Sequence, residues 1–256
     1  MNKILRIVLL VVFAGVLLFS GYQVFSVLNE YQQADTLYES VQQEFVEIVP
    51  TTTLTFAEQP EESKKTSSAP IRVDFPGLLS HNGDVVGWLY CPDTVVNYPV
   101  AQAEDNNTYL HADLSGEYLR SGTLFLECEN TPQPMVQNNY IVYGHSMKNG
   151  SMFGALLKYK KQSFYDEHPV WYYLTPDRDY RIELIAGAVV KTHRDIFTTT
   201  LNDVAMVKEL SVLKEMSTFT SDVTYTDEDA FITLSTCSYE FNDARYVVVG
   251  KLVPLN

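Results

Sequence analysis

The sequence contains few cysteines. Three, at positions 91, 128 and 237, occur in 256 residues. They are too few for a disulfide scaffold, and no two of them have the C-x-x-C spacing of a zinc or redox site. Cys91 and Cys128 can pair and leave Cys237 free. We favour two separate buried thiols, because free cysteine is readily buried.

Positive charge is also scarce. The chain has 18 Lys and Arg against 32 Asp and Glu, a formal charge of −14. Nucleic-acid binding needs clustered basic residues, so the composition argues against it, and it argues equally against broad adhesion to an anionic membrane. Calcium loops of the DxDxDG type are missing, and residues 227–229 (Asp-Glu-Asp) indicate a solvated turn. We therefore expect no metal and no cofactor.

The chain begins with a long apolar run over residues 7–25. About 20 helical residues at 1.5 Å each span a hydrocarbon core of about 30 Å. Lys3 and Arg6 precede the run and acidic residues follow it, which predicts a cytoplasmic N-terminus and an extracellular remainder. A cleaved signal peptide is the alternative. A retained anchor is favoured because the run shows no clear A-x-A cleavage site.

Two kinds of sequence connect the anchor to the rest of the chain. Residues 28–48 carry Leu37, Val41, Phe45 and Ile48 at helical spacing, which predicts a helical stalk. Residues 49–70 are rich in threonine, proline and charge and read as a tether. The predicted organisation is therefore an anchor over 1–27, a stalk and linker over 28–70, and a catalytic domain over 71–256.

Short apolar runs separated by turn residues dominate the last part of the chain. They predict strands at 85–90, 95–100, 123–126, 140–143, 171–174, 180–190, 230–237 and 246–252. Helical patterns cover residues 74–82, 151–159 and 203–216. In the last, Val204, Val207, Leu210, Leu213 and Met216 share one side, with a cap at Asn202 or Asp203. Many short strands at this spacing favour a closed or nearly closed β-barrel, mainly β with helical insertions.

Residues with useful chemistry stand at the ends of three predicted strands. Cys237 ends one strand, and Arg245 opens the next after a short loop, so the two are expected at facing ends of a hairpin. A thiol beside a fixed cation is a candidate nucleophile. His145 ends the strand at 140–143 and is a candidate general acid and base. The alternatives are a structural cysteine and an arginine paired with Asp243 or Glu240.

Strand alternation favours an accessible Cys237. Ile232 and Leu234 share one face of their strand, while Ser235 and Cys237 share the other. If the aliphatic side chains face the core, Ser235 and Cys237 face a groove.

Several separated motifs resemble class B sortases, membrane-anchored cysteine transpeptidases of Gram-positive bacteria. They are Thr-Leu-Ser-Thr-Cys at 233–237 with Arg245 after it, Tyr-Gly-His at 143–145, Asp-Val-Val-Gly-Trp-Leu at 84–89, Asn-Tyr-Pro-Val at 97–100 and the segment 144–153. The resemblance covers roughly residues 71–256. It implies a closed eight-stranded barrel with an N-terminal helix and a long helix before the cysteine strand.

The resemblance also implies the reaction. Cys237, His145 and Arg245 would cleave a C-terminal sorting motif of exported proteins and pass the acyl group to an amine of a lipid-linked peptidoglycan precursor. Asn106, Leu110 and Ser235 would border the substrate. Some relatives carry an acidic residue two positions after the nucleophile, where this chain has Tyr239. The site is therefore read as His–Cys–Arg without an acidic partner.

Three other functions stay open on the sequence alone. A pilin polymerase would use the same chemistry with a lysine amine as acceptor. A hydrolytic cysteine protease would need no amine. A membrane-tethered adhesion module would use Cys237 only as a structural residue.

Overall fold

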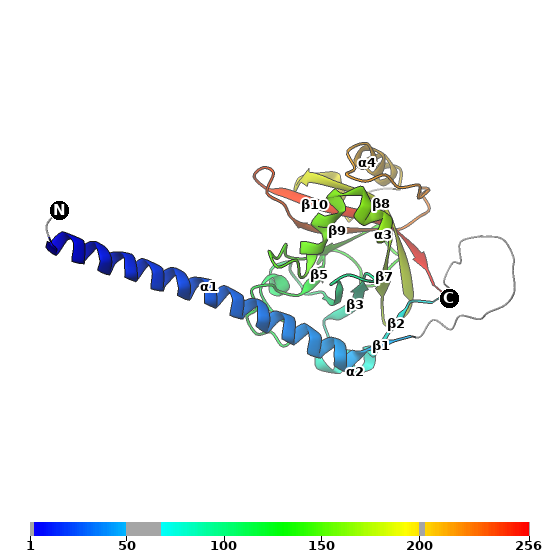
Figure 1. The fold of residues 1–256 in the computed structure, drawn as a ribbon. Coiled ribbons are helices and arrows are strands. Elements are labelled where there is room, and N and C mark those ends of the chain that lie inside the picture. The colour runs from blue at the N-terminus through cyan, green and yellow to red at the C-terminus, as the bar shows by residue number, and fades with distance from the viewer. Residues whose placement is uncertain (1–2, 50–67, 200–202, 256) are drawn as a thin grey trace, which may run out of the picture.

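The protein is described by a computed structural model, which covers residues 3–49, 68–199 and 203–255. A β-barrel forms the body of the molecule, and one long helix extends away from it toward the N-terminus (Figure 1). The barrel strands are β3 (Val85–Tyr90), β4 (Asn97–Ala101), β5 (Leu124–Leu126), β6 (Asn139–Tyr143), β7 (Val170–Leu174), β8 (Asp179–Lys191), β9 (Phe231–Cys237) and β10 (Ala244–Pro254).

The barrel is closed, with the strand order β10-β8-β7-β3-β4-β5-β6-β9. Neighbouring strands are antiparallel except for the pairs β4–β5 and β6–β9, which are parallel. The expected closed eight-stranded barrel is therefore confirmed. Each predicted strand is present, with ends that shift by a few residues.

The remaining elements cover the barrel. The helices are α1 (Lys3–Phe45), α2 (Phe75–His81), α3 (Gln162–Glu167) and α4 (Asp203–Glu215), and the 3-10 helices are η1 (Thr108–Leu110), η2 (Phe153–Lys160) and η3 (Asp195–Phe197). A two-stranded sheet joins β1 (Val46–Ile48) to β2 (Ile71–Val73). The insertion expected at 151–159 is thus a 3-10 helix.

Alternation along the strands sorts side chains between the barrel interior and its outer layers. On β9, Ile232 and Leu234 enter the interior cluster, whereas Phe231 joins the cluster beneath α4. Thr233 and Ser235 share the outward face of β9 and are nevertheless buried, at 0% and 1% exposed. The outer face of the cysteine strand is therefore covered almost to its end.

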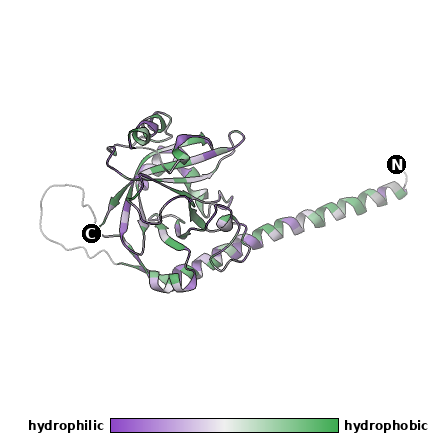
Figure 2. Ribbon diagram, turned by 180° about the vertical axis from the view of Figure 1, so that it is seen from behind, coloured by the Kyte–Doolittle hydropathy of each residue, from purple (hydrophilic) through white to green (hydrophobic). Residues whose placement is uncertain are grey.

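The α1 helix has an exposed part and a packed part. Its apolar side chains at Ile7 and from Leu9 to Phe25 are exposed, and Figure 2 shows the free part of the helix as mainly hydrophobic. Within the described residues, α1 is long and apolar enough to cross a membrane. Its last turns are buried against the barrel through Ala34, Tyr38 and Phe45.

This packing differs from the expected stalk. The predicted helix over 28–48 is wrong at its end, because the chain leaves the helix after Phe45 and pairs with β2. Ile48 lies in β1 and is 77% exposed. A helical period cannot reveal that a neighbouring strand is available to continue the chain as a sheet.

The predicted apolar side of α4 is confirmed at Leu210 and Leu213 and is wrong at its two ends. Met206, Leu210 and Leu213 are buried, whereas Val204 and Met216 are exposed. Glu209 lies on the buried face, where its carboxylate accepts two hydrogen bonds from Arg194, at 2.7 and 2.9 Å. A prediction that counts only apolar residues leaves Glu209 out of the buried face, although its ion pair with Arg194 allows it to be buried. Asp203 is the first described residue of α4, and Asn202 lies outside the described residues.

Candidate functional site

The β9–β10 hairpin brings Cys237 and Arg245 together. The two residues are direct partners in the antiparallel register, at the end of the ladder. Ser238, the next residue, donates its backbone N–H to the carbonyl of Ala244 at 3.0 Å. The hairpin therefore holds the thiol and the guanidinium on adjacent strand ends, and the N–H of Ser238 is already used.

The parallel pairing of β6 with β9 delivers His145 to the same end of the barrel. Tyr143 is the register partner of Ser235, and the Gly144 N–H donates to the Ser235 carbonyl at 3.2 Å. The Thr236 hydroxyl donates to the Gly144 carbonyl at 2.8 Å. A Cβ on Gly144 would lie 2.4 Å from a Leu124 methyl, so only glycine fits this close approach. His145 is thereby placed on the next residue, above the end of β9.

One pocket of about 250 Å³ contains all six residues singled out in the sequence. Cys237, His145 and Arg245 line it together with Asn106, Leu110 and Ser235. Its other walls include Phe125, Tyr143, Thr192, Phe197 and Thr236. Tyr143 and Thr236 belong to the family motifs, whereas Thr192 and Phe197 had no signal in the sequence. The Ser235 hydroxyl is buried and has no hydrogen-bond partner among the described residues.

His145 is oriented by a backbone carbonyl. Its Nε2 lies 2.8 Å from the oxygen of Leu110, and since a carbonyl only accepts, Nε2 carries the proton. The second ring nitrogen, Nδ1, is then the atom left to exchange a proton. Among the described residues no carboxylate lies within hydrogen-bonding distance of His145.

The surroundings of His145 disfavour its charged form. Burial lowers the pKa of His145, the hydrogen bond to Leu110 opposes that effect, and the charge of His111 lowers the pKa further. The rings of His111 and His145 are stacked, with centroids 5.1 Å apart and planes 21° apart. His111 is exposed, and its contact with His145 is visible only in the fold.

Comparison with known proteins agrees with this arrangement. The family model of the sortase domain matches residues 89–253, which is more than half of the chain. The chain belongs to the sortase family. The cysteine transpeptidase activity expected from the motifs is thereby confirmed.

The relatives are sortases of class B, as the motifs predicted. Sortase B of Listeria monocytogenes is 33% identical over 96% of this chain and 95% of its own length. The crystal structure of sortase B from Bacillus anthracis in complex with AAEK1 superposes with a TM-score of 0.72 at 30% identity, over 89% of this chain and 99% of that one. The Staphylococcus aureus sortase B–substrate complex gives 0.67 at 32% identity, over 71% and 85%.

Arg245 of this sortase is not engaged in an ion pair. Its side chain donates to the Ala244 carbonyl at 3.1 Å, and no described carboxylate lies within 4.0 Å of it. Glu240 instead binds Lys160 and the Ser238 hydroxyl. The hydrogen bond from Lys160 is the main cause that lowers the pKa of Glu240 to about 2. The alternative of a rim arginine paired with Glu240 or Asp243 is therefore not observed.

Asn106 is held by a buried acid that the sequence did not reveal. Its Nδ2 donates to Glu127 at 2.5 Å, and its Oδ1 accepts the backbone N–H of Cys128 at 2.9 Å. Glu127 also accepts the Tyr143 hydroxyl at 2.8 Å and is 9% exposed. Burial opposes its ionisation, but donors from Asn106, Tyr143 and Cys128 outweigh that effect and lower the pKa of Glu127. The Asn106 amide is thus fixed in one orientation at the pocket edge.

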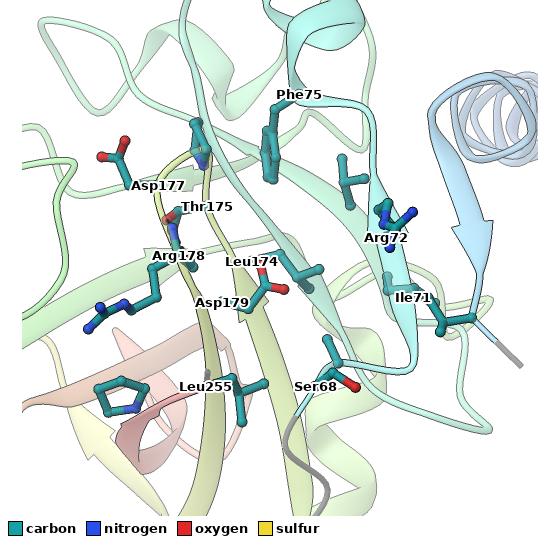
Figure 3. Close-up of a pocket in the computed structure, with 15 residues that line it drawn as sticks. Ser68, Ile71, Arg72, Phe75, Leu174, Thr175, Asp177, Arg178, Asp179 and Leu255 are labelled. Atoms are coloured by element: carbon teal, nitrogen blue, oxygen red, sulfur yellow. Dashed lines mark hydrogen bonds between the residues drawn. The ribbon is translucent and has the colours of Figure 1, made fainter. Parts of the chain in front are cut away.

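A larger cavity, of about 580 Å³, lies elsewhere (Figure 3). It is bordered by Arg72 and Phe75 on one side and by the β7–β8 turn with Asp177, Arg178 and Asp179 on the other. None of the candidate residues lines it, and no cluster of histidine, cysteine or acidic residues suited to a metal occurs in the described parts of the chain. The smaller pocket is the candidate site because it holds the thiol, the imidazole and the guanidinium together.

The other two thiols of the sortase are free. Cys91 is buried, and burial raises its pKa to about 12. Cys128 is half-buried beside Glu127, so the expectation of two buried thiols holds only for Cys91. A disulfide between them is not observed.

Proposed function

We propose that this sortase cleaves a sorting motif through a thioacyl enzyme and transfers the acyl group to an amine. The convergence of Cys237, His145 and Arg245 on one pocket is the observation that carries the proposal. The Cys237 thiolate attacks the carbonyl of the scissile peptide bond. The C–N bond then breaks, and the departing amine takes a proton from His145. An incoming amine attacks the thioester, returns a proton to His145 and releases Cys237.

The hydrogen bond to Leu110 supports Nδ1 of His145 as the atom that exchanges the proton. Nε2 stays bonded to the carbonyl in both protonation states, so the ring does not need to turn during the reaction. Lowering of the pKa by burial favours proton release to the leaving amine. The cost is a smaller fraction of protonated His145 at neutral pH.

Arg245 is proposed to bind the substrate carbonyl and the oxyanion that forms from it. A guanidinium without a carboxylate partner keeps its charge and its donors free for this purpose. Asn106, Leu110 and Ser235 are proposed to contact the sorting motif. The buried, unpartnered hydroxyl of Ser235 and the fixed amide of Asn106 suit recognition of a polar substrate group.

The membrane anchor and the cell-wall acceptor belong to the same proposal. A helix with exposed apolar side chains at Ile7 and over residues 9–25 suits a retained span with a cytoplasmic N-terminus and the barrel outside. Exported proteins and lipid-linked peptidoglycan precursors meet at that surface, where tethering raises their effective concentration. The division into anchor (1–27), stalk and linker (28–70) and catalytic domain (71–256) remains part of this proposal.

The test uses the full-length protein in detergent micelles with peptides that contain Asn-Pro-x-Thr or Leu-Pro-x-Thr cores. Mass spectrometry follows the products with glycine-type amines, with lysine-type amines and without any amine. The proposal expects a thioacyl adduct on Cys237 that moves to the amine and is absent in Cys237→Ala. Transfer only to lysine would indicate pilin polymerisation, and equal product release without amine would indicate a protease. Neither cleavage nor labelling of Cys237 by small electrophiles would favour the adhesion module.

A further inference from the structure

The packed part of α1 contacts both loops that hold His145. One is the histidine loop, residues 144–152, which follows β6 and carries His145 itself. The other is the carbonyl loop, residues 109–123, which supplies the Leu110 oxygen bonded to Nε2. Residues 30–38 of α1 reach across both, on the side where the helix leaves the barrel (Figure 1).

Tyr38 is the central contact with the carbonyl loop. Its side chain is 4% exposed, and its hydroxyl donates to the Gly122 carbonyl at 2.5 Å and lies 3.2 Å from the Thr123 hydroxyl. Thr123 in turn donates its hydroxyl to the Ala112 carbonyl at 2.9 Å. A buried hydroxyl that donates to a backbone carbonyl holds the two groups in one arrangement.

The carbonyl loop transmits that arrangement to Leu110. The Thr123 N–H donates to the Tyr109 carbonyl at 3.0 Å, so the two ends of the loop are bonded together. Gly122 has φ +57, and a Cβ there would lie 2.4 Å from the Leu110 oxygen. The carbonyl that orients His145 therefore packs directly against the residue that Tyr38 binds.

The histidine loop is supported from the same helix. Asn149 donates to Asp35 at 3.4 Å. The Tyr38 ring packs edge-on against Tyr98, with centroids 5.2 Å apart, and the Tyr98 hydroxyl accepts the Met152 N–H at 3.2 Å. Met152 closes the loop by pairing with Ser146, the residue after His145.

We propose that the membrane-proximal part of α1 is a positioning element of the active site, with Tyr38 as its principal residue. It holds the carbonyl loop and the histidine loop in fixed relative positions, so that the hydrogen bond between His145 Nε2 and the Leu110 carbonyl persists during turnover. An exposed ion pair between Glu30 and Arg120, at 3.2 Å, adds a weaker contact. The inference rests on the proposed role of His145, and it makes the anchor helix part of the catalytic unit rather than a passive tether.

The test compares Tyr38→Phe with Gln42→Ala in the full-length protein in detergent micelles. Tyr38→Phe keeps the ring on Tyr98 and removes only the hydroxyl. Gln42→Ala is the matched control, because Gln42 also donates from α1 to a backbone carbonyl, that of Asn97 at 2.8 Å, but on strand β4 away from both loops. Three quantities are measured: kcat and KM for a cleaved sorting peptide, the pKa of His145 from NMR of labelled histidine, and the unfolding midpoint from tryptophan fluorescence.

Tyr38→Phe is expected to lower kcat about 5- to 20-fold with KM within about twofold, since small misplacements of a catalytic group are costly. It should also lower the pKa of His145, because the Leu110 hydrogen bond supports the charged ring. Gln42→Ala should leave kcat and the pKa unchanged. Asp35→Ala should lower kcat in the same direction through the histidine loop.

Two results would overturn the inference. One is a His145 pKa in Tyr38→Phe equal to that of the wild type, even if stability falls. The other is an equal loss of kcat in Gln42→Ala. Failure of the proposed function is distinguishable, because it would appear as absence of peptide transfer by the wild-type protein. In that case the His145 titration alone decides whether α1 positions the ring.

Discussion

Substitution of Glu127 tests whether a buried carboxylate organises the edge of the pocket. In Glu127→Ala, the Asn106 amide and the Tyr143 hydroxyl each lose a charged acceptor. Hydrogen bonds to charged groups contribute about 1.5–3 kcal/mol each, so two of them amount to about 3–6 kcal/mol. Asn106 and Tyr143 are only half-buried, and water that reaches them reduces the expected loss to about 2–4 kcal/mol.

Glu127→Gln is the matched variant, because it keeps the volume and one acceptor oxygen. Its amide can donate to the Tyr143 hydroxyl while its oxygen still accepts from Asn106. The expected loss is about 1–2 kcal/mol, the difference between charged and neutral hydrogen bonds. Glu127→Ala should raise KM for a sorting peptide, because it releases Asn106 from its fixed orientation, whereas Glu127→Gln keeps that acceptor and should raise KM less.

The pH dependence follows from the lowered pKa of Glu127. A depressed pKa in the folded state contributes stability above the unfolded value of about 4.3, and this contribution disappears as pH falls through the folded value. The stability gap between wild type and Glu127→Gln should therefore be complete at pH 7 and close progressively below about pH 4.

Urea unfolding followed by tryptophan fluorescence measures these differences cleanly. Both tryptophans, Trp88 and Trp171, are fully buried in the barrel, and α1 contains none. The reasoning would be refuted if Glu127→Gln were as unstable as Glu127→Ala. It would also be refuted if the gap between wild type and glutamine were the same at pH 3 and pH 7.

Three further predictions concern the surroundings of the site. His111→Phe keeps a ring stacked on His145 and removes a like charge, so the pKa of His145 should rise. The limb of the pH–rate profile that reports His145 should move to higher pH. An unchanged NMR titration of His145 would contradict this prediction. Glu209→Ala leaves the Arg194 guanidinium without its carboxylate and should lower the free energy of unfolding by about 1.5–3 kcal/mol, whereas Lys208→Ala on the exposed face of α4 should cost less than about 0.5 kcal/mol. Gly144→Ala would place a methyl group 2.4 Å from the Leu124 side chain of β5, so it should lower the free energy of unfolding by about 1–3 kcal/mol and reduce kcat. Wild-type turnover in this variant would contradict the prediction, because it would show that the loop after β6 adjusts freely.

Much of the barrel was predictable from local pattern, and so were Cys237, Arg245, His145 and Ser235, whereas Asn106 and Leu110 came from the family resemblance. Period-2 alternation and turn residues located each barrel strand, because inward-facing and outward-facing side chains alternate along a half-buried strand. The two candidates separated by only a short loop, Cys237 and Arg245, were placed by hairpin geometry. His145 is 92 positions from Cys237; its place at the end of a predicted strand made it a candidate, and the resemblance to known motifs joined it to the cysteine.

Periodicity misled at the surfaces where elements meet. The inner face of α4 includes Glu209, whose charge is neutralised by Arg194 from another element, so hydrophobicity alone identified only part of the buried face. The end of α1 was misplaced because β2 supplies the pairing partner for residues 46–48. Both errors arise from partners distant in the chain.

The sequence by itself determined the strand pattern, the apolar N-terminal run and the family motifs, because these depend on residues close together in the chain. Only the tertiary structure decided what surrounds them. Three contacts join residues separated by 21 or more positions. They are the stacking of His111 on His145, the hydrogen bond from Asn106 to Glu127 and the contact of Tyr38 with the carbonyl loop. Such contacts form when the barrel closes, and no local periodicity encodes them.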